Sequence, residues 1–177
     1  MNSINKLLIE KPSDVLSIYF TAGFPSLDDT SKVIQQLSEV DVDFIEVGLP
    51  YSDPLADGPT IQKSSQKALD NGINLDLIFN QLMQIKETNT KPLVLMGYLN
   101  QLLKYGEVPF CQKALACGID TLILPDLPMV EYENHYKALF DSFGIDLVFL
   151  ITPLTSFDRI QKIDAYSKSF IYVVASS

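Results

Sequence analysis

The stretch from Phe44 to Thr60, FIEVGLPYSDPLADGPT, constrains the fold more than any other part of the chain. It opens with apolar residues on both faces of a short strand, which is typical of a strand buried between helices and a core. Strand side chains alternate between faces, so we expect Glu46 on the side of Phe44 and Gly48, opposite positions 45, 47 and 49. A carboxylate inside such a strand needs a partner or a function.

The segment after this strand is a stiff loop that carries a second acid. Pro50, Pro54 and Gly58 punctuate it, and Pro59 suits the first position of a helix, which places Asp57 just before a helix N-terminus. Buried unpaired acids concentrate at active sites, which favours a functional role for Glu46 and makes one possible for Asp57. The alternatives are an ion pair for the glutamate, helix capping for the aspartate, and plain turn chemistry for Ser52 and Asp53.

Composition limits the class of protein. A chain of 177 residues with 47% hydrophobic content can bury a sizeable core, and residues 1–177 are most simply one domain. The net charge of −9 argues against a nucleic-acid or anionic membrane partner, because both need a basic face. A small anionic substrate remains open, since backbone amides can bind phosphate.

Cysteine usage and the N-terminus indicate a cytoplasmic protein. Cys111 and Cys117 lie six positions apart in a helical stretch and point in different directions, so we expect reduced core thiols. The N-terminal segment lacks the apolar region of a signal peptide, and no apolar run approaches membrane-spanning length.

Strand and helix patterns alternate along the whole chain. Strands are predicted from Phe44 and at Val15–Thr21, Pro92–Tyr98, Thr121–Leu124, Asp146–Thr152 and Ser169–Ala175. Helices are predicted at Asn2–Glu10, after a capping box of Ser26 and Asp29, from Pro59 to about Asn71, at Leu75–Glu87, between Pro109 and Gly118, at Val130–Phe143, and at Ser156–Ala165 with Thr155 as its cap.

Six strand–helix units without a hairpin signal predict a parallel sheet with right-handed crossovers. An open doubly wound sheet and a closed barrel both fit this order. The first strand–helix turn, TAGFPS, lacks the spaced glycines of a dinucleotide fingerprint. Acids and tyrosines near several strand ends suit a barrel, in which all strand ends face one mouth; they are Glu46, Tyr98, Asp126 and Tyr172.

The residue inventory excludes several chemistries. His135 is the only histidine and falls on a predicted helix, so zinc sites and Ser-His-Asp triads lack a ligand or a base, and no metal is expected. Lys91 and Lys168 precede their strands, at the end opposite a barrel mouth, which argues against a Schiff-base lysine. Carboxylate acid–base chemistry on a small molecule remains, with an aromatic wall from Tyr19, Tyr98 and Tyr172.

Four motifs together resemble one family, the tryptophan synthase alpha chains: FIEVGLPYSDPLADGPTIQ at 44–62, YFTAGFP at 19–25, GYLN at 97–100 and LPDLP at 124–128. The resemblance implies a (β/α)8 TIM barrel. It also implies retro-aldol cleavage of indole-3-glycerol phosphate to indole and glyceraldehyde 3-phosphate, as a step of tryptophan biosynthesis.

The resemblance assigns roles to individual residues. Glu46 matches the catalytic glutamate of the family and Asp57 its catalytic aspartate. The indole pocket maps to Tyr19, Met96, Tyr98, Ile123, Ile151 and Tyr172, with Tyr172 orienting Glu46. Ordinary core packing is the alternative for Met96, Ile123 and Ile151.

The resemblance also implies a partner, a tryptophan synthase beta chain that carries pyridoxal phosphate and receives the indole through a tunnel within a heterotetramer. Pro50 and Asp53 are expected at or near that contact. No cofactor is expected in the alpha chain itself.

The family pattern continues beyond FIYVVASS with a Gly-Val-Thr-Gly type loop and two further strands that hold the substrate phosphate. A complete barrel of this kind has about 250 residues, so we expect the first six βα units of a C-terminally incomplete barrel, inactive by itself. Two hypotheses stay open: a lyase of which this is the N-terminal portion, and a noncatalytic module that binds and modulates a beta-type partner.

Overall fold

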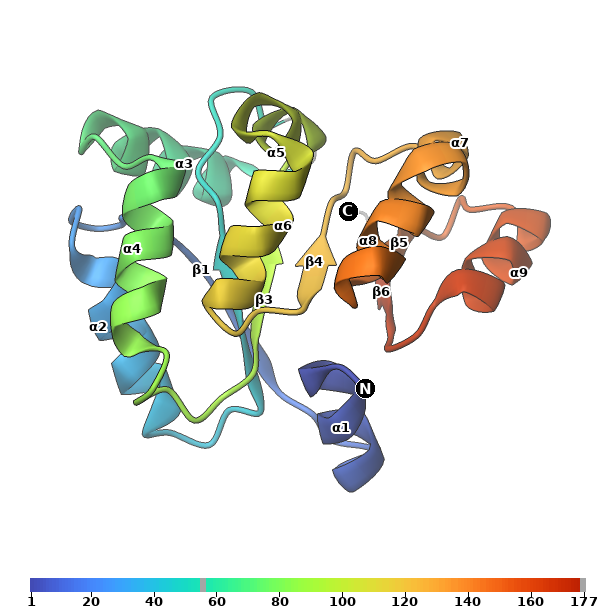
Figure 1. Cartoon of the computed structure of the whole chain (residues 1–177), viewed down its shortest axis with the longest axis horizontal. Coiled ribbons are helices and arrows are strands. Elements are labelled where there is room, and N and C mark those ends of the chain that lie inside the picture. Colours follow the sequence, from blue (N-terminus) through green and yellow to red (C-terminus); the bar gives the residue numbers. More distant parts are fainter. Residues whose placement is uncertain (55–56, 176–177) are drawn as a thin grey trace.

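The computed structural model describes residues 1–54 and 57–175 and contains one parallel sheet (Figure 1). All six predicted strands are present, in the spatial order β1-β2-β3-β4-β5-β6. Their bounds are β1 Ser17–Thr21, β2 Phe44–Gly48, β3 Leu93–Met96, β4 Thr121–Ile123, β5 Asp146–Ile151 and β6 Ile171–Val173. A doubly wound sheet reverses its strand order at a switch point, so the consecutive order decides for the barrel type.

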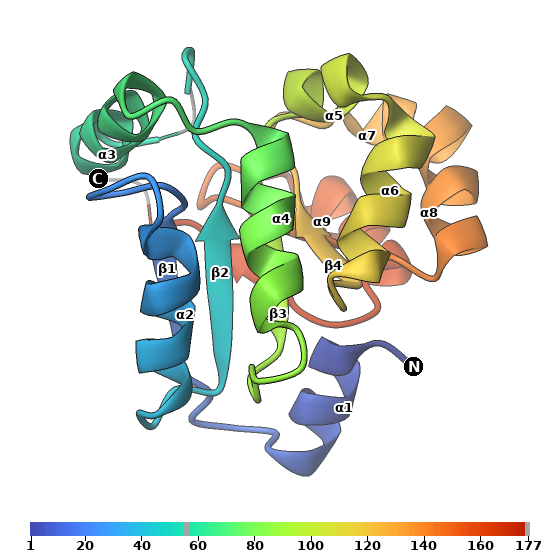
Figure 2. The ribbon, with the colours of Figure 1, turned by 60° about the vertical axis from the view of Figure 1, so that its left-hand side comes forward.

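Helices cover the outer face of this sheet, and one helix lies elsewhere. Those of the outer layer are α2 Asp29–Ser38, α3 Pro59–Asp70, α4 Leu75–Ile85, α5 Leu99–Tyr105, α6 Glu107–Ala116, α7 Met129–Glu131, the π-helical turn Tyr132–Tyr136, α8 Lys137–Phe143 and α9 Phe157–Tyr166. Helix α1, Ser3–Glu10, lies at the end from which the strands start, away from the arrowheads (Figure 2). None of these helices is long and apolar enough to cross a membrane within the described ranges.

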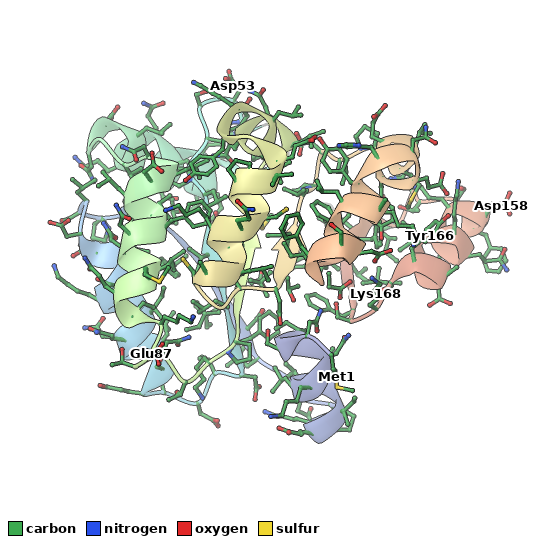
Figure 3. The ribbon with its side chains drawn as sticks, in the orientation of Figure 1. Met1, Asp53, Glu87, Asp158, Tyr166 and Lys168 are labelled. Atoms are coloured by element: carbon green, nitrogen blue, oxygen red, sulfur yellow. The ribbon has the colours of Figure 1, made fainter. Side chains whose placement is uncertain are left out.

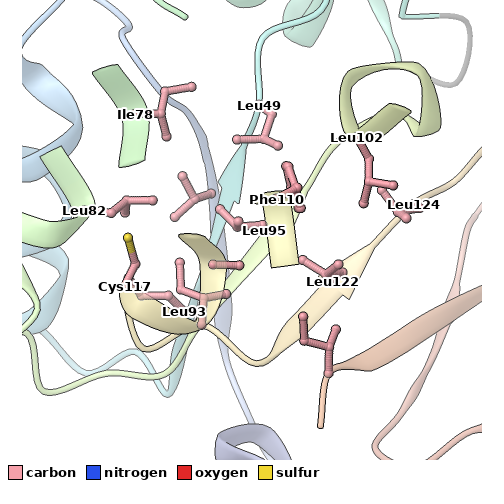
Figure 4. Packing of buried hydrophobic residues seen from close by; sticks show 14 of the residues in the cluster. Leu49, Ile78, Leu82, Leu93, Leu95, Leu102, Phe110, Cys117, Leu122 and Leu124 are labelled. Carbon is pink, nitrogen blue, oxygen red and sulfur yellow. The ribbon is translucent and has the colours of Figure 1, made fainter. Parts of the chain in front are cut away.

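The sheet separates two apolar clusters because strand side chains alternate. The outer cluster joins alternate strand residues to the helices, including Leu93, Leu95, Leu122 and Phe110 (Figure 4). The inner cluster lies on the concave face and comprises Ile4, Phe44, Val94, Ile123 and Val148, with Met96, Leu150, Phe170 and Tyr172 packed against it.

Curling of the sheet is visible in one aromatic contact. The Phe44 ring on β2 lies 5.7 Å from the Phe170 ring, which immediately precedes β6. Strands that are four apart in the sheet therefore approach each other across the concave face, and the six strands form a half-barrel of alternating βα units. Ile4 of α1 is completely buried in the same cluster, so α1 closes the amino end of the half-barrel.

Three local predictions were wrong. The single helix expected between β3 and β4 is two helices, because Gly106 adopts φ +97° between α5 and α6. Thr155 does not cap α9; its hydroxyl accepts the Thr152 N–H (2.8 Å), and the N-cap is Ser156. Helix α2 begins at Asp29, whose carboxylate accepts the Ser26 N–H (3.1 Å), so only one of the two capping-box bonds forms.

Candidate functional site

Glu46 lies on the concave face of β2, on the same side as Phe44, as predicted. It is 2% exposed, and the Ser17 hydroxyl donates to its Oε1 (2.6 Å). Its Oε2 has no hydrogen-bond partner among the described residues, and it makes no salt bridge with any of them. Burial raises the pKa of Glu46, and the Ser17 hydrogen bond opposes that rise.

Asp57 lies beyond the carboxyl end of β2, where the chain enters α3. The Tyr98 hydroxyl donates to its Oδ2 (3.0 Å), and its side chain is half-buried. Burial raises the Asp57 pKa, and the Tyr98 hydrogen bond opposes the shift. Gly58 is the N-cap of α3, with Pro59 at the first helical position as predicted, so Asp57 is not the helix cap.

The Tyr19 side chain lies near both carboxylates, and the charge of each affects its pKa. It is aligned with Glu46 in the β1–β2 register. Burial, with smaller contributions from the charges of Asp57 and Glu46, raises the Tyr19 pKa to about 12. The hydroxyl also lies over Gly48, where an added Cβ would come within 2.0 Å of the Tyr19 oxygen. The concave face near the strand ends therefore brings both acids and this phenol together.

The other predicted pocket residues separate into two groups. Met96, Ile123 and Tyr172 belong to the inner cluster, on the face that carries Glu46. Ile151 does not: it packs against the outer cluster, and the inward residue beside it on β5 is Leu150. The pleat of β5 explains this placement, because Val148 and Leu150 face inward and alternate residues face the helices.

Tyr172 lies close to Glu46 without being its observed hydrogen-bond donor. Burial raises the pKa of Tyr172, and the Glu46 charge contributes to the shift. The hydroxyl that donates to Glu46 comes from Ser17, a residue that sequence reasoning missed. Its place two positions before Tyr19 on the same strand face was the available signal.

Pro50 and Asp53, the predicted contact residues, lie at the rim outside the concave face. The Pro50 carbonyl accepts from Gln101 Nε2 (2.8 Å), and the neighbouring Tyr51 ring stacks on Tyr98 at 4.9 Å. Asp53 is exposed near the tip of the β2–α3 loop (Figure 3). Both residues line a cavity of about 530 Å³ that also touches α4 and α5.

The histidine, lysine and cysteine residues that the sequence analysis excluded from the site chemistry lie away from Glu46 and Asp57. His135 is on the surface of the π-helical turn and contacts Glu107 (2.9 Å). Lys168 precedes β6 and bonds Asp141. Cys111 and Cys117 are buried and free, and burial raises the pKa of the Cys111 thiol to about 11. The described part of the chain has no group of three or more histidine, cysteine or acidic side chains placed to hold a metal ion.

Comparison with known proteins agrees with the motifs. The sequence model of the family "Tryptophan synthase alpha chain" matches residues 6–177. The tryptophan synthase alpha chain of Flavobacterium psychrophilum is 52% identical over 177 residues, which are the whole of this chain and 70% of that relative.

Solved structures agree on the fold. Tryptophan synthase subunit alpha from Legionella pneumophila superposes with a TM-score of 0.91 at 36% identity, over 99% of this chain and 68% of that one. A structure of Mycobacterium tuberculosis tryptophan synthase gives 0.92 at 28% identity, over 99% and 68%. Family match, high identity and shared barrel fold lead to one conclusion. The chain belongs to the family of tryptophan synthase alpha chains, the lyases of tryptophan biosynthesis.

Proposed function

We propose that this chain contributes the acid–base groups for retro-aldol cleavage of indole-3-glycerol phosphate to indole and glyceraldehyde 3-phosphate, in the cytoplasm. The observation that carries the proposal is a pair of carboxylates, Glu46 on the concave face of β2 and Asp57 beyond its carboxyl end, both with pKa values raised by burial. Functional sites concentrate such groups, and strand ends are where TIM barrels place their chemistry.

The reaction needs two proton transfers at neighbouring atoms. Carbon three of the indole gains a proton, and the hydroxyl on the adjacent glycerol carbon loses one. The carbon–carbon bond between them then breaks, and its electron pair returns to the ring. A protonated Glu46 can donate the first proton and, as a carboxylate, accept the second, so its net state is unchanged. The raised pKa and the unpartnered Oε2 suit that exchange.

Asp57 has a different role in this proposal. It accepts a hydrogen bond from the indole N–H and stabilises the positive charge that develops on the ring after protonation. Its position beyond β2 supports the assignment, because it is less buried than Glu46 and is held by the Tyr98 hydroxyl. Met96, Ile123 and Tyr172 of the inner cluster, with Tyr19 beside Glu46 on β1, supply an apolar and aromatic surface for the ring.

The proposal is tested by removing the titrating proton in a complete protein that contains all eight βα units. Glu46→Gln preserves size but cannot shuttle a proton, so the rate of indole release is expected to fall at least about a hundredfold. Asp57→Asn is expected to lower kcat more than it raises KM, because its charge matters most as the intermediate forms.

Asp146→Asn is the matched control for the glutamate substitution. Asp146 is also a buried acid, 3% exposed with an unpartnered Oδ2 among the described residues, but it starts β5 at the amino end. This variant should keep most of the wild-type turnover. Near-normal cleavage by Glu46→Gln, or an equal loss in both variants, would remove Glu46 from the mechanism.

The second part of the proposal is a beta-chain partner that carries pyridoxal phosphate and receives the indole, while this chain holds no cofactor. The rim cavity lined by Pro50 and Asp53 supports a contact there, since it is open and combines apolar residues with acids. The same observation would serve a noncatalytic module that modulates a beta-type partner. A rim substitution such as Asp53→Lys would then abolish partner binding, while Glu46→Gln would leave the rate of indole release unchanged. That pair of results would favour the second function.

A further inference from the structure

The donor to Glu46 is a residue to which neither the motifs nor the comparisons assign a role. Ser17 is the first residue of β1 and is half-buried on the concave face. It pairs in register with Phe44, whereas Tyr19 pairs with Glu46. Two residues along a strand span about 6.6 Å, so the Glu46 side chain reaches back toward the amino end to meet the Ser17 hydroxyl.

We propose that Ser17 is a positioning residue for Glu46, whose hydroxyl fixes Oε1 toward the amino end of the strands and leaves Oε2 free to exchange protons. The inference rests on the proposed acid–base function of Glu46 and deepens it. One oxygen is held at 2.6 Å, and the other has no partner within the described residues. A carboxyl held by one oxygen has a defined direction and one open site.

The Ser17 hydrogen bond has a large effect on Glu46 because few other groups on the concave face can interact with the carboxyl. The apolar residues packed around Glu46 on the concave face come from α1, β3, β4 and β5 and include Ile4, Val94 and Val148. One further acid lies on this face, Asp146 at the amino end of β5. The titratable groups that face Glu46 are Tyr19 from β1, whose pKa is about 12, and Tyr172 from β6, whose pKa is also raised. Both phenols are therefore neutral near pH 7 and place no charge beside Glu46.

Ser17 thus opposes the effect of burial. Burial favours the neutral carboxylic acid, and a hydrogen bond to the carboxylate favours the ion. A group that must donate and later accept a proton works best when neither form is strongly preferred. Without the hydroxyl, burial would act unopposed, and the Glu46 pKa would rise further.

The test measures the ionisation of Glu46 directly, so it does not depend on turnover. The complete protein is labelled with ¹³C at glutamate side-chain carboxyls, and the Glu46 resonance is identified by its absence in Glu46→Gln. Its pKa is then titrated by NMR in the wild type and in Ser17→Ala. We expect the Ala variant to raise the Glu46 pKa by about one unit, and the corresponding limb of the kcat profile to move equally toward higher pH.

Two variants separate positioning from mere packing. Ser17→Thr keeps the hydroxyl and should restore the wild-type pKa. Ser38→Ala removes another half-buried serine hydroxyl, which lies at the end of α2 and donates to Ile34 O and to Asn89 Oδ1, and it should leave the Glu46 pKa unchanged. Ser17→Cys, a weaker donor of similar size, should give an intermediate shift and replaces the Ala variant if that one does not fold.

The proposal is overturned if loss of the Ser17 hydroxyl leaves the Glu46 pKa within about 0.2 unit of wild type, or if Ser38→Ala shifts it as much. If no variant, including the wild type, releases indole while Ser17→Ala still shifts the pKa, the acid–base function fails. The positioning of Glu46 by Ser17 survives that result.

Discussion

Gly48 leaves room for the Tyr19 side chain on the concave face of β2, and substituting Gly48 tests this close packing. A Cβ at this position would lie 2.0 Å from the Tyr19 oxygen, 2.4 Å from Cζ and 2.6 Å from Cε2. Ordinary contact begins near 3.4 Å, so in Gly48→Ala the hydroxyl would have to withdraw by about 1.4 Å. Overpacking of this size costs about 1–3 kcal/mol, and we expect a loss of about 2 kcal/mol in the free energy of unfolding.

The assay is urea unfolding of the complete protein, followed by far-UV circular dichroism and tyrosine fluorescence. In a double-mutant cycle, Tyr19→Phe removes the oxygen but leaves the ring carbons, so it should relieve only part of the clash. We expect a coupling energy of about 0.5–1 kcal/mol between positions 19 and 48. Gly58→Ala is the control, because nothing lies within 4 Å of its added Cβ.

Gly58 is the N-cap of α3, so alanine there should cost no more than about 1 kcal/mol. The reasoning is refuted if Gly48→Ala unfolds at the same urea concentration as wild type. It is equally refuted if Tyr19→Phe and Gly48→Ala are strictly additive, since the two side chains would then not compete for one space.

Two further predictions concern the edges and the rim. A polypeptide that stops at Ser177 leaves β1 and β6 each with one unpaired edge among the described strands. We expect it to self-associate or to be loosely folded and to release no indole; a monomer by light scattering that melts cooperatively and cleaves at a full-length rate would contradict this. Asp53→Lys should weaken beta-chain binding in calorimetry, whereas Glu87→Lys, an exposed acid at the opposite end (Figure 3), should not; equal effects would argue against the rim as the contact.

Periodicity predicted the strands and the face of Glu46 because both depend on local alternation. Glu46 is inward with Phe44 for the same reason that position 45 is outward. The order of the strands in space was beyond the pattern, which fits a doubly wound sheet equally well. Residues near several different strand ends favoured the barrel, and the consecutive strand order confirms it.

The sequence predictions failed at strand ends, at a glycine with positive φ and at a long side chain, where residue periodicity does not determine the structure. Ile151 ends β5; the resemblance mapped it to the pocket, with core packing as the alternative, and the structure supports the alternative because the pleat directs Ile151 to the helices and Leu150 inward. The sequence predicted one helix between β3 and β4, with Pro109 near its start, and missed α5, which Gly106 separates from α6 by its positive φ. The Ser17 bond depends on the rotamers of a long side chain, which alternation does not define.

The two carboxylates illustrate how one physical effect can yield two roles. Burial raises both pKa values, but the groups differ in depth and in donor. Glu46 is 2% exposed, holds one hydroxyl contact from β1 and keeps a free oxygen, so proton exchange at that oxygen has no competitor among the described residues. Asp57 is half-buried at the mouth, where the Tyr98 hydroxyl donates to its Oδ2, favours its ionised form against burial and fixes its position. Environments that separate two acids in this way separate the proton carrier from the electrostatic stabiliser, and the proposed division of labour follows from their positions on the barrel.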